Sequence, residues 1–123
     1  MVRALGLVVF SMLACARPPP APPPPLVAPG TYNGRPPKYV GLLQLTVRED
    51  GTATFLNVVS VHLPPRELER REVKLERGAD GRVCMNPAPD AVEPCLAQEQ
   101  GGALTVKTKD EGTAVLLEPV PAQ

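Results

Sequence analysis

Apolar residues occupy every second position on both sides of the tripeptide Glu49-Asp50-Gly51, and this alternation constrains the fold more than any other feature of the sequence. A period of two residues is typical of a β-strand that buries one face and leaves the other in water. The chain therefore contains a β-hairpin with one buried face. Its apolar residues share odd numbers: Leu43, Leu45, Val47, Ala53, Phe55, Val59, Val61 and Leu63.

The same alternation predicts the register of the hairpin. A two-residue loop at Asp50-Gly51 would set Val47 against Thr54, whereas a three-residue loop from Glu49 to Gly51 sets apolar residues against apolar ones. Gly51 then takes the left-handed position that ends such a loop. The predicted pairs are Val47 with Ala53, Thr46 with Thr54 and Leu45 with Phe55.

Three further apolar residues, Val40, Leu56 and Val58, lie on the other face of this hairpin. That face is therefore either partly covered or offers an apolar patch to a partner.

Other segments carry weaker strand signals. We expect strands at Thr31 to Gly34, Arg82 to Asn86, Ala103 to Thr108 and Thr113 to Glu118, with Val106 facing Val115 and Leu104 facing Leu117. After Pro64-Pro65, the charged run Arg66 to Arg77 is expected to begin as a short helical turn and to continue as an edge strand through Val73 and Leu75. The mixed signs of its charges favour a solvated face over a contact surface.

These elements predict an all-β domain over residues 30–121. About six or seven short strands in antiparallel meander order would form a small open barrel or a sandwich.

The first sixteen residues, MVRALGLVVFSMLACA, have the layout of an export signal. Arg3 supplies a positive charge, an apolar run follows, and small residues surround Cys15. The run is shorter than the roughly 20 residues that a spanning helix needs, so an uncleaved anchor is disfavoured. Cleavage after Ala14 gives a signal peptide of residues 1–14, whereas ordinary secretion would use the small residues around Cys15 and discard the cysteine.

The residues Met12-Leu13-Ala14-Cys15 resemble the lipobox of bacterial lipoproteins, although that family prefers Leu where Met12 stands. The resemblance implies that Cys15 becomes the N-terminus and carries lipid, which attaches the chain to the membrane. With Ala16 after the cysteine, it also implies the outer membrane, facing the periplasm or the cell surface.

Of three cysteines, Cys84 and Cys95 remain as a pair once Cys15 is lipidated. Cysteines of exported proteins usually pair, and a domain this small commonly needs a covalent crosslink, so we expect a structural disulfide. The alternative, a soft metal site for copper that joins these cysteines to Met85 and His62, has no diagnostic spacing. His62, the only histidine, lies on the outward parity of a strand and is interpreted as a surface residue.

Residues 15–29 comprise Cys15 and a linker, and residues 17–29 are rich in proline, which fixes φ and removes backbone donors. We expect a polyproline II spacer with a reach of roughly 40 Å. A ligand for an aromatic groove is the alternative, because PxxP spacing occurs within it.

Composition limits the function. Thirteen Lys and Arg balance thirteen Asp and Glu, which argues against nucleic-acid binding. The sequence has no phosphate-binding glycine loop, nucleophile elbow or paired-histidine motif, so we predict no enzyme activity and no cofactor.

A fainter resemblance involves the turn residues Gly30-Thr31-Tyr32-Asn33-Gly34 and Glu49-Asp50-Gly51-Thr52. They are similar to those of small β-barrel envelope lipoproteins of the NlpE type. The chain lacks the closely spaced cysteine pair of that family, so the resemblance implies a fold and no metal sensing.

Three functional hypotheses follow. The leading one is a non-enzymatic cell-envelope lipoprotein that binds an envelope protein or a cell-wall partner through a strand face or a sheet edge. The second is inhibition of an extracytoplasmic hydrolase by the loop between Cys84 and Cys95. The third is binding of copper or another soft metal.

Overall fold

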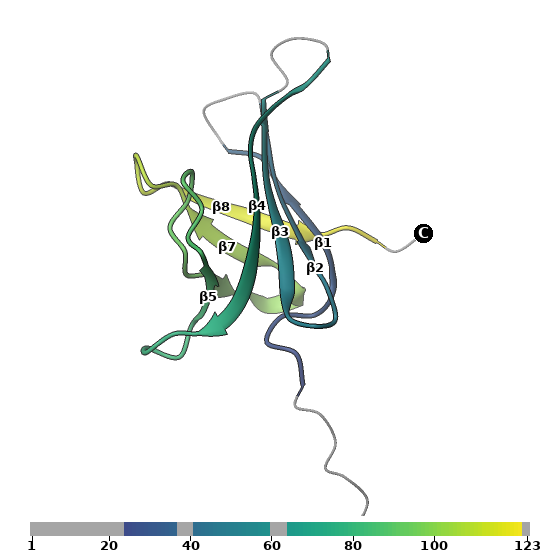
Figure 1. Ribbon diagram of the computed structural model, residues 1–123, viewed down its shortest axis with the longest axis vertical. Coiled ribbons are helices and arrows are strands. Elements are labelled where there is room, and N and C mark those ends of the chain that lie inside the picture. The colour runs from purple at the N-terminus through teal and green to yellow at the C-terminus, as the bar shows by residue number, and fades with distance from the viewer. Residues whose placement is uncertain (1–23, 37–40, 60–63, 122–123) are drawn as a thin grey trace, which may run out of the picture.

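A computed structural model describes residues 24–36, 41–59 and 64–121 of the 123-residue chain. Within these residues the protein is an all-β barrel of eight antiparallel strands with one 3-10 turn (Figure 1). None of the helical structure described there is long and apolar enough to cross a membrane. The strands are β1 Gly30–Gly34, β2 Gly41–Val47, β3 Thr52–Val59, β4 Arg66–Arg77, β5 Val83–Asn86, β6 Ala97–Gln98, β7 Leu104–Lys107 and β8 Ala114–Pro119, and the 3-10 turn is Gln100–Gly102.

The sheet order is β5-β4-β3-β2-β1-β8-β7-β6, so strands that follow one another in the chain are neighbours in the sheet, except for β5 and β6, which stand at its two ends. The first and last strands, β1 and β8, also pair with each other. The remaining boundary, between β5 and residues 94–96 just before β6, is closed by an antiparallel bridge between Cys84 and Cys95. The prediction of an antiparallel meander is confirmed, and the sheet closes on itself.

The β2–β3 hairpin confirms the register predicted from the alternation. Leu45 faces Phe55, Thr46 faces Thr54 and Val47 faces Ala53. Gly51 has φ +88°, the left-handed conformation that the three-residue loop requires. The register of β7 and β8 is also confirmed, with Val106 opposite Val115 and Leu104 opposite Leu117.

The core lies inside the barrel, where the inward side chains of the strands meet. Phe55 is its largest fully buried side chain, and Leu43, Leu45 and Leu117 beside it are fully excluded from water. An eight-stranded barrel is just wide enough for its side chains to fill the interior. The remaining members are Val27, Tyr32, Val47, Ala53, Val73, Leu75, Val83, Met85, Val92, Leu96, Leu104, Val106 and Val115.

One local expectation is wrong. The segment that follows Pro65 contains no helical turn, and Arg66–Arg77 is a single strand of twelve residues. Residues 66–74 of this strand pair with β3, with a register shift opposite Asn57 and Val58, and residues 74–77 pair with β5. Pairing with the neighbouring strand thus overrides the local preference of a charged run for helix.

The packed unit also begins earlier than Gly30. Val27 is buried at 3% exposure, and Leu26 packs against the core. The hydroxyl of Tyr32 donates to the carbonyl of Ala28 at 2.6 Å, and Gln98 donates to the carbonyl of Leu26 at 2.7 Å. The end of the expected spacer is therefore fixed to the barrel, and residues 15–23 lie outside the described part of the chain.

Candidate functional site

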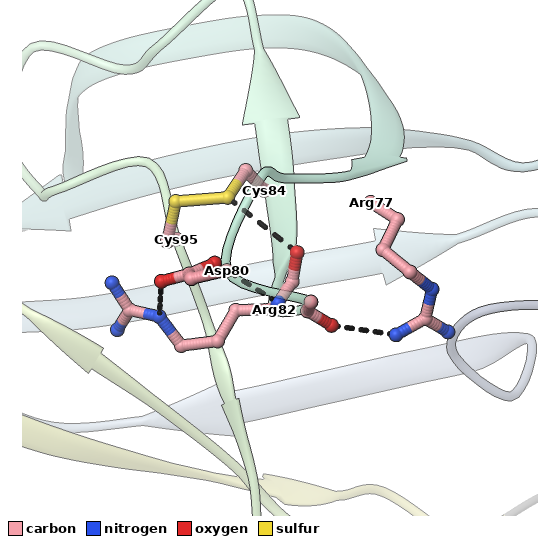
Figure 2. Close-up of a disulfide and its surroundings, with 6 residues drawn as sticks. Arg77, Asp80, Arg82, Cys84 and Cys95 are labelled. Atoms are coloured by element: carbon pink, nitrogen blue, oxygen red, sulfur yellow. Dashed lines mark hydrogen bonds and ion pairs between the residues drawn. A yellow bond between two sulfur atoms is a disulfide. The ribbon is translucent and has the colours of Figure 1, made fainter.

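The disulfide closes the weakest boundary of the barrel, which we call the seam: strand β5 against residues 94–96. Cys84 and Cys95 are joined there, as the cysteine count predicts (Figure 2). Two backbone hydrogen bonds flank the disulfide, from Met85 N to the carbonyl of Pro94 and from Leu96 N to the carbonyl of Val83, each at 2.8 Å. Every other pair of neighbouring strands is joined by a ladder of at least two residue pairs. The seam has a single bridged pair, so its stability depends most on the disulfide.

A charged turn lies beside the disulfide (Figure 2). Asp80 accepts from the backbone N–H of Arg82 at 3.1 Å and from its side-chain Nε at 2.8 Å. These bonds hold the pKa of Asp80 below its ordinary value. Arg77 donates to the carbonyl of Gly81 at 2.6 Å, so side chains at both ends of the turn fix its backbone.

The loop between the cysteines folds back onto the barrel. The carboxylate of Glu69 accepts from the backbone N–H groups of Asp90 and Ala91 at 2.7 and 3.1 Å, and from Arg71 at 3.1 Å. Lys109 donates to the carbonyl of Pro89 at 2.9 Å. The Glu69 side chain is only 11% exposed, so the acceptor itself is largely covered by the loop and the barrel.

This packing bears on the hypothesis of an inhibitory loop. A loop that inserts into a hydrolase must present its side chains to the partner, but Pro89 and Val92 are buried. Val92 also forms an antiparallel bridge with Thr108. Pro89 and Val92 thus belong to the barrel wall, while Pro87, Ala88, Asp90 and Glu93 of the same loop are exposed.

We expect Glu69→Ala to lower the free energy of unfolding by about 1 kcal/mol, because the backbone N–H groups of Asp90 and Ala91 lose their acceptor. Chemical denaturation measures this loss, and amide exchange at Asp90 and Ala91 should accelerate. Glu67→Ala is the matched control on the same strand, since its exposed pair with Arg70 contributes little. Equal effects of the two substitutions would contradict the role assigned to Glu69.

The outer face of the β2–β3 hairpin carries the predicted apolar residues. Leu56 and Val58 are half-buried there, and Leu42 faces Val58 across the strand pair. Leu116 of β8 is 48% exposed and lines the same groove as Leu42. We call Leu42, Leu56, Val58 and Leu116 the outer patch. Val40 lies outside the described residues.

The groove in the outer patch has a volume of about 530 Å³. Its floor is Gly34, where a Cβ atom would lie 2.3 Å from the carbonyl oxygen of Leu116. Only glycine lets β1 and β8 approach so closely. Polar groups surround the floor, and Gln44 donates to Asn33 at 2.9 Å. The lining residues are Asn33, Gly34, Arg35, Leu42, Leu116 and Glu118.

A polar network covers the outer face near the β2–β3 turn. Arg48 donates to Thr52 and Thr54 at 2.9 Å each and pairs with Glu72. Thr54 donates to Glu72 at 2.7 Å. Hydrogen bonds from Thr54 and Arg48 hold the pKa of Glu72 below its ordinary value, and bonds from Thr52 do the same for the pKa of Asp50.

The lowered pKa values of Glu72 and Asp50 set the sign of a pH effect. Each carboxylate stabilises the fold when charged, so its contribution is present above the unfolded-state pKa and is lost as the pH falls through the lower folded-state pKa. We expect the melting temperature to fall modestly below about pH 4.5. Glu72→Gln should make this fall shallower, and Glu49→Gln, an exposed carboxylate in the adjoining turn, is the control. A melting temperature that is independent of pH below pH 4.5 would contradict the network.

Two of the sequence-predicted positions, Cys15 and His62, lie outside the described residues. Cys84 and Cys95 meet in the disulfide, so in this state neither sulfur is a thiolate that could bind copper. Among the described residues, no group of three His, Cys, Asp or Glu side chains is placed to hold a metal ion.

The sequence does not reveal two features of these sites. Glu69 looks like any other residue of a charged run, and only the packing of a distant loop gives it a role. The close approach at Gly34 depends on Leu116 of β8, which lies 82 residues further along the chain. A glycine inside a strand is the one signal that points to such an approach.

Comparison of the chain with protein-family models, with curated proteins and with solved structures finds no match in any of the three.

Proposed function

We propose that this chain is a non-enzymatic lipoprotein of the bacterial cell envelope, anchored by lipid on Cys15, which binds an envelope protein through the outer patch. The outer patch is the observation that carries the proposal. Leu42 and Leu116 line one groove on the outside of a barrel whose interior is already filled by its own core, and Val58 lies opposite Leu42 with Leu56 two positions before it on the same strand. Apolar residues grouped on an exterior surface are typical of interaction sites.

The chemistry of the outer patch favours a protein as partner. Its members are leucine and valine, which pack well against apolar side chains but offer no flat aromatic face to a sugar ring. Arg35 and Glu118 beside the groove place one charge of each sign at its rim. The lining of the groove is more polar than apolar, so a protein segment with both apolar and charged side chains would match it.

The position of the outer patch suits a tethered module. The described chain enters the barrel before β1, and β1 then leads away from this entry toward the groove (Figure 1). For an anchor that precedes residue 24, the groove therefore lies at the end of β1 that is further from the anchor. We propose that the spacer lifts the barrel and that the outer patch meets its partner away from the membrane.

Site-specific photocrosslinking in cells tests this proposal. A photoreactive phenylalanine at position 116 should give a discrete adduct of higher mass, whereas the same residue at Lys74, an exposed position of β4 outside the patch, should not. Leu42→Asp in the same chain should abolish the adduct while the purified variant keeps its β-sheet circular dichroism. Adducts of equal yield from both positions, no adduct from position 116, or an adduct that survives Leu42→Asp would contradict the proposal.

A further inference from the structure

The two sulfur atoms of the disulfide have different surroundings. Cys95 lines a surface pocket of about 240 Å³, and Cys84 is not among the lining residues. The Cys84 sulfur instead lies against the turn shown in Figure 2, at 3.7 Å from the carbonyl oxygen of Arg82. A Cβ atom added to Gly78 would lie 3.0 Å from the same sulfur, so this side of the disulfide is closely covered. The pocket therefore opens onto Cys95, whereas the turn covers one side of Cys84.

The pocket beside Cys95 also contains a cation that could act on a thiol. Its charged lining residues are Arg82, Lys107 and Glu93. Arg82 is already paired with Asp80, whereas no ion pair of Lys107 is found within the described residues. A cationic group beside a disulfide attracts an anionic thiolate and stabilises the negative charge that passes through the reacting sulfur atoms.

From these observations we infer that the pocket is a site of thiol–disulfide exchange, at which a small anionic thiol attacks the sulfur of Cys95. The attacking thiolate forms a bond to Cys95 Sγ while the bond between the two cysteines breaks. The electron pair of the broken bond leaves on Cys84 Sγ, which takes a proton from solvent. The products are a mixed disulfide on Cys95 and a free thiol on Cys84, so one disulfide replaces another and no further oxidant or reductant is needed.

Exchange at this site would weaken the seam. The mixed disulfide removes the only covalent bond between β5 and residues 94–96, and only the two flanking backbone hydrogen bonds remain there. The inference does not depend on the outer patch or on the lipid, because it concerns a different face and other residues.

The first experiment treats the purified, folded protein with 3-mercaptopropionate, an anionic thiol. The reaction is stopped with acid, free thiols are alkylated, and fragmentation of the tryptic peptide that spans both cysteines locates each group. We expect mercaptopropionate on Cys95 and the alkyl group on Cys84. The opposite assignment, an even distribution, or reaction only after addition of denaturant would overturn the inference.

The second experiment tests the charge of the pocket. The rates of exchange with the protein disulfide are measured for mercaptopropionate and for cysteamine, a cationic thiol. Each rate is then divided by the rate at which the same thiol reacts with a small reference disulfide. We expect the corrected rate to be about threefold higher for the anionic thiol at low salt. Lys107→Gln should bring the ratio close to one, and Lys74→Gln, a matched change on β4, should leave it unchanged. A ratio of one in the unmodified protein, or equal effects of the two substitutions, would contradict the assigned role of Lys107.

Discussion

Replacement of both Cys84 and Cys95 by serine should lower the free energy of unfolding by about 3 kcal/mol, the amount expected from the entropy of closing a loop with a sequence separation of 11. The loss should be this large because the seam has only two backbone hydrogen bonds of its own. Chemical denaturation of the variant and of the unmodified protein provides the measurement. The barrel should remain folded at low denaturant, since all the other strand pairs are unchanged.

Reduction of the unmodified protein is the control for this prediction. Reduced protein and the double serine variant should lose the same stability, because both lack the crosslink and differ only in two small side chains. A loss below about 0.5 kcal/mol, the usual size of a neutral surface change, would contradict the importance assigned to the seam.

Gly34→Ala should lower the free energy of unfolding by about 2 to 3 kcal/mol, in the upper range for overpacking. The added methyl group would lie 2.3 Å from the carbonyl oxygen of Leu116 and 2.6 Å from Cδ2 of Leu117. The first of these atoms belongs to the backbone, so the strands themselves must move apart. Because β1 and β8 share only two paired positions, we expect this boundary of the barrel to loosen first.

Two measurements separate this local effect from general destabilisation. The amide of Val120, which donates to the carbonyl of Thr31 at 2.8 Å, should exchange faster in the Gly34→Ala variant. Thr31→Ala on the same strand is the control, and its effect should stay within about 0.5 kcal/mol. Unchanged stability and unchanged exchange at Val120 would show that β1 and β8 do not approach as closely as described.

The sequence was sufficient for the local part of this fold. Leu45 opposite Phe55 and Val106 opposite Val115 follow from a single rule, that buried faces must match across a short loop. A loop of three or four residues leaves few registers to choose from, and the parity of the apolar residues selects one. The disulfide follows from the even number of cysteines in the domain.

The non-local part was not predictable in the same way. Tyr32 pairs with Pro119 across nearly the whole domain, and no loop length or parity specifies that contact. The first half of β4 was misjudged because its charges resemble those of a solvated helix, whereas the free edge of β3 determines its conformation. Val27 belongs to the core although it follows a run of prolines, because the open end of the barrel accepts it.

The outer patch was predicted in part. Leu56 and Val58 were identified on the second face of the hairpin from their parity alone. Leu116 interrupts the alternation of its strand, and this interruption exposes an apolar side chain at the groove.

A lipid on Cys15 is the proposed tether that would place the barrel and its outer patch in the envelope. Cells that express the protein are grown with labelled palmitate, and the protein is isolated from the membrane fraction. We predict that the label is incorporated, that the mature chain begins at residue 15, and that Cys15→Ser abolishes both. An unlabelled mature chain, or a labelled chain in the Cys15→Ser variant, would contradict the proposed anchor.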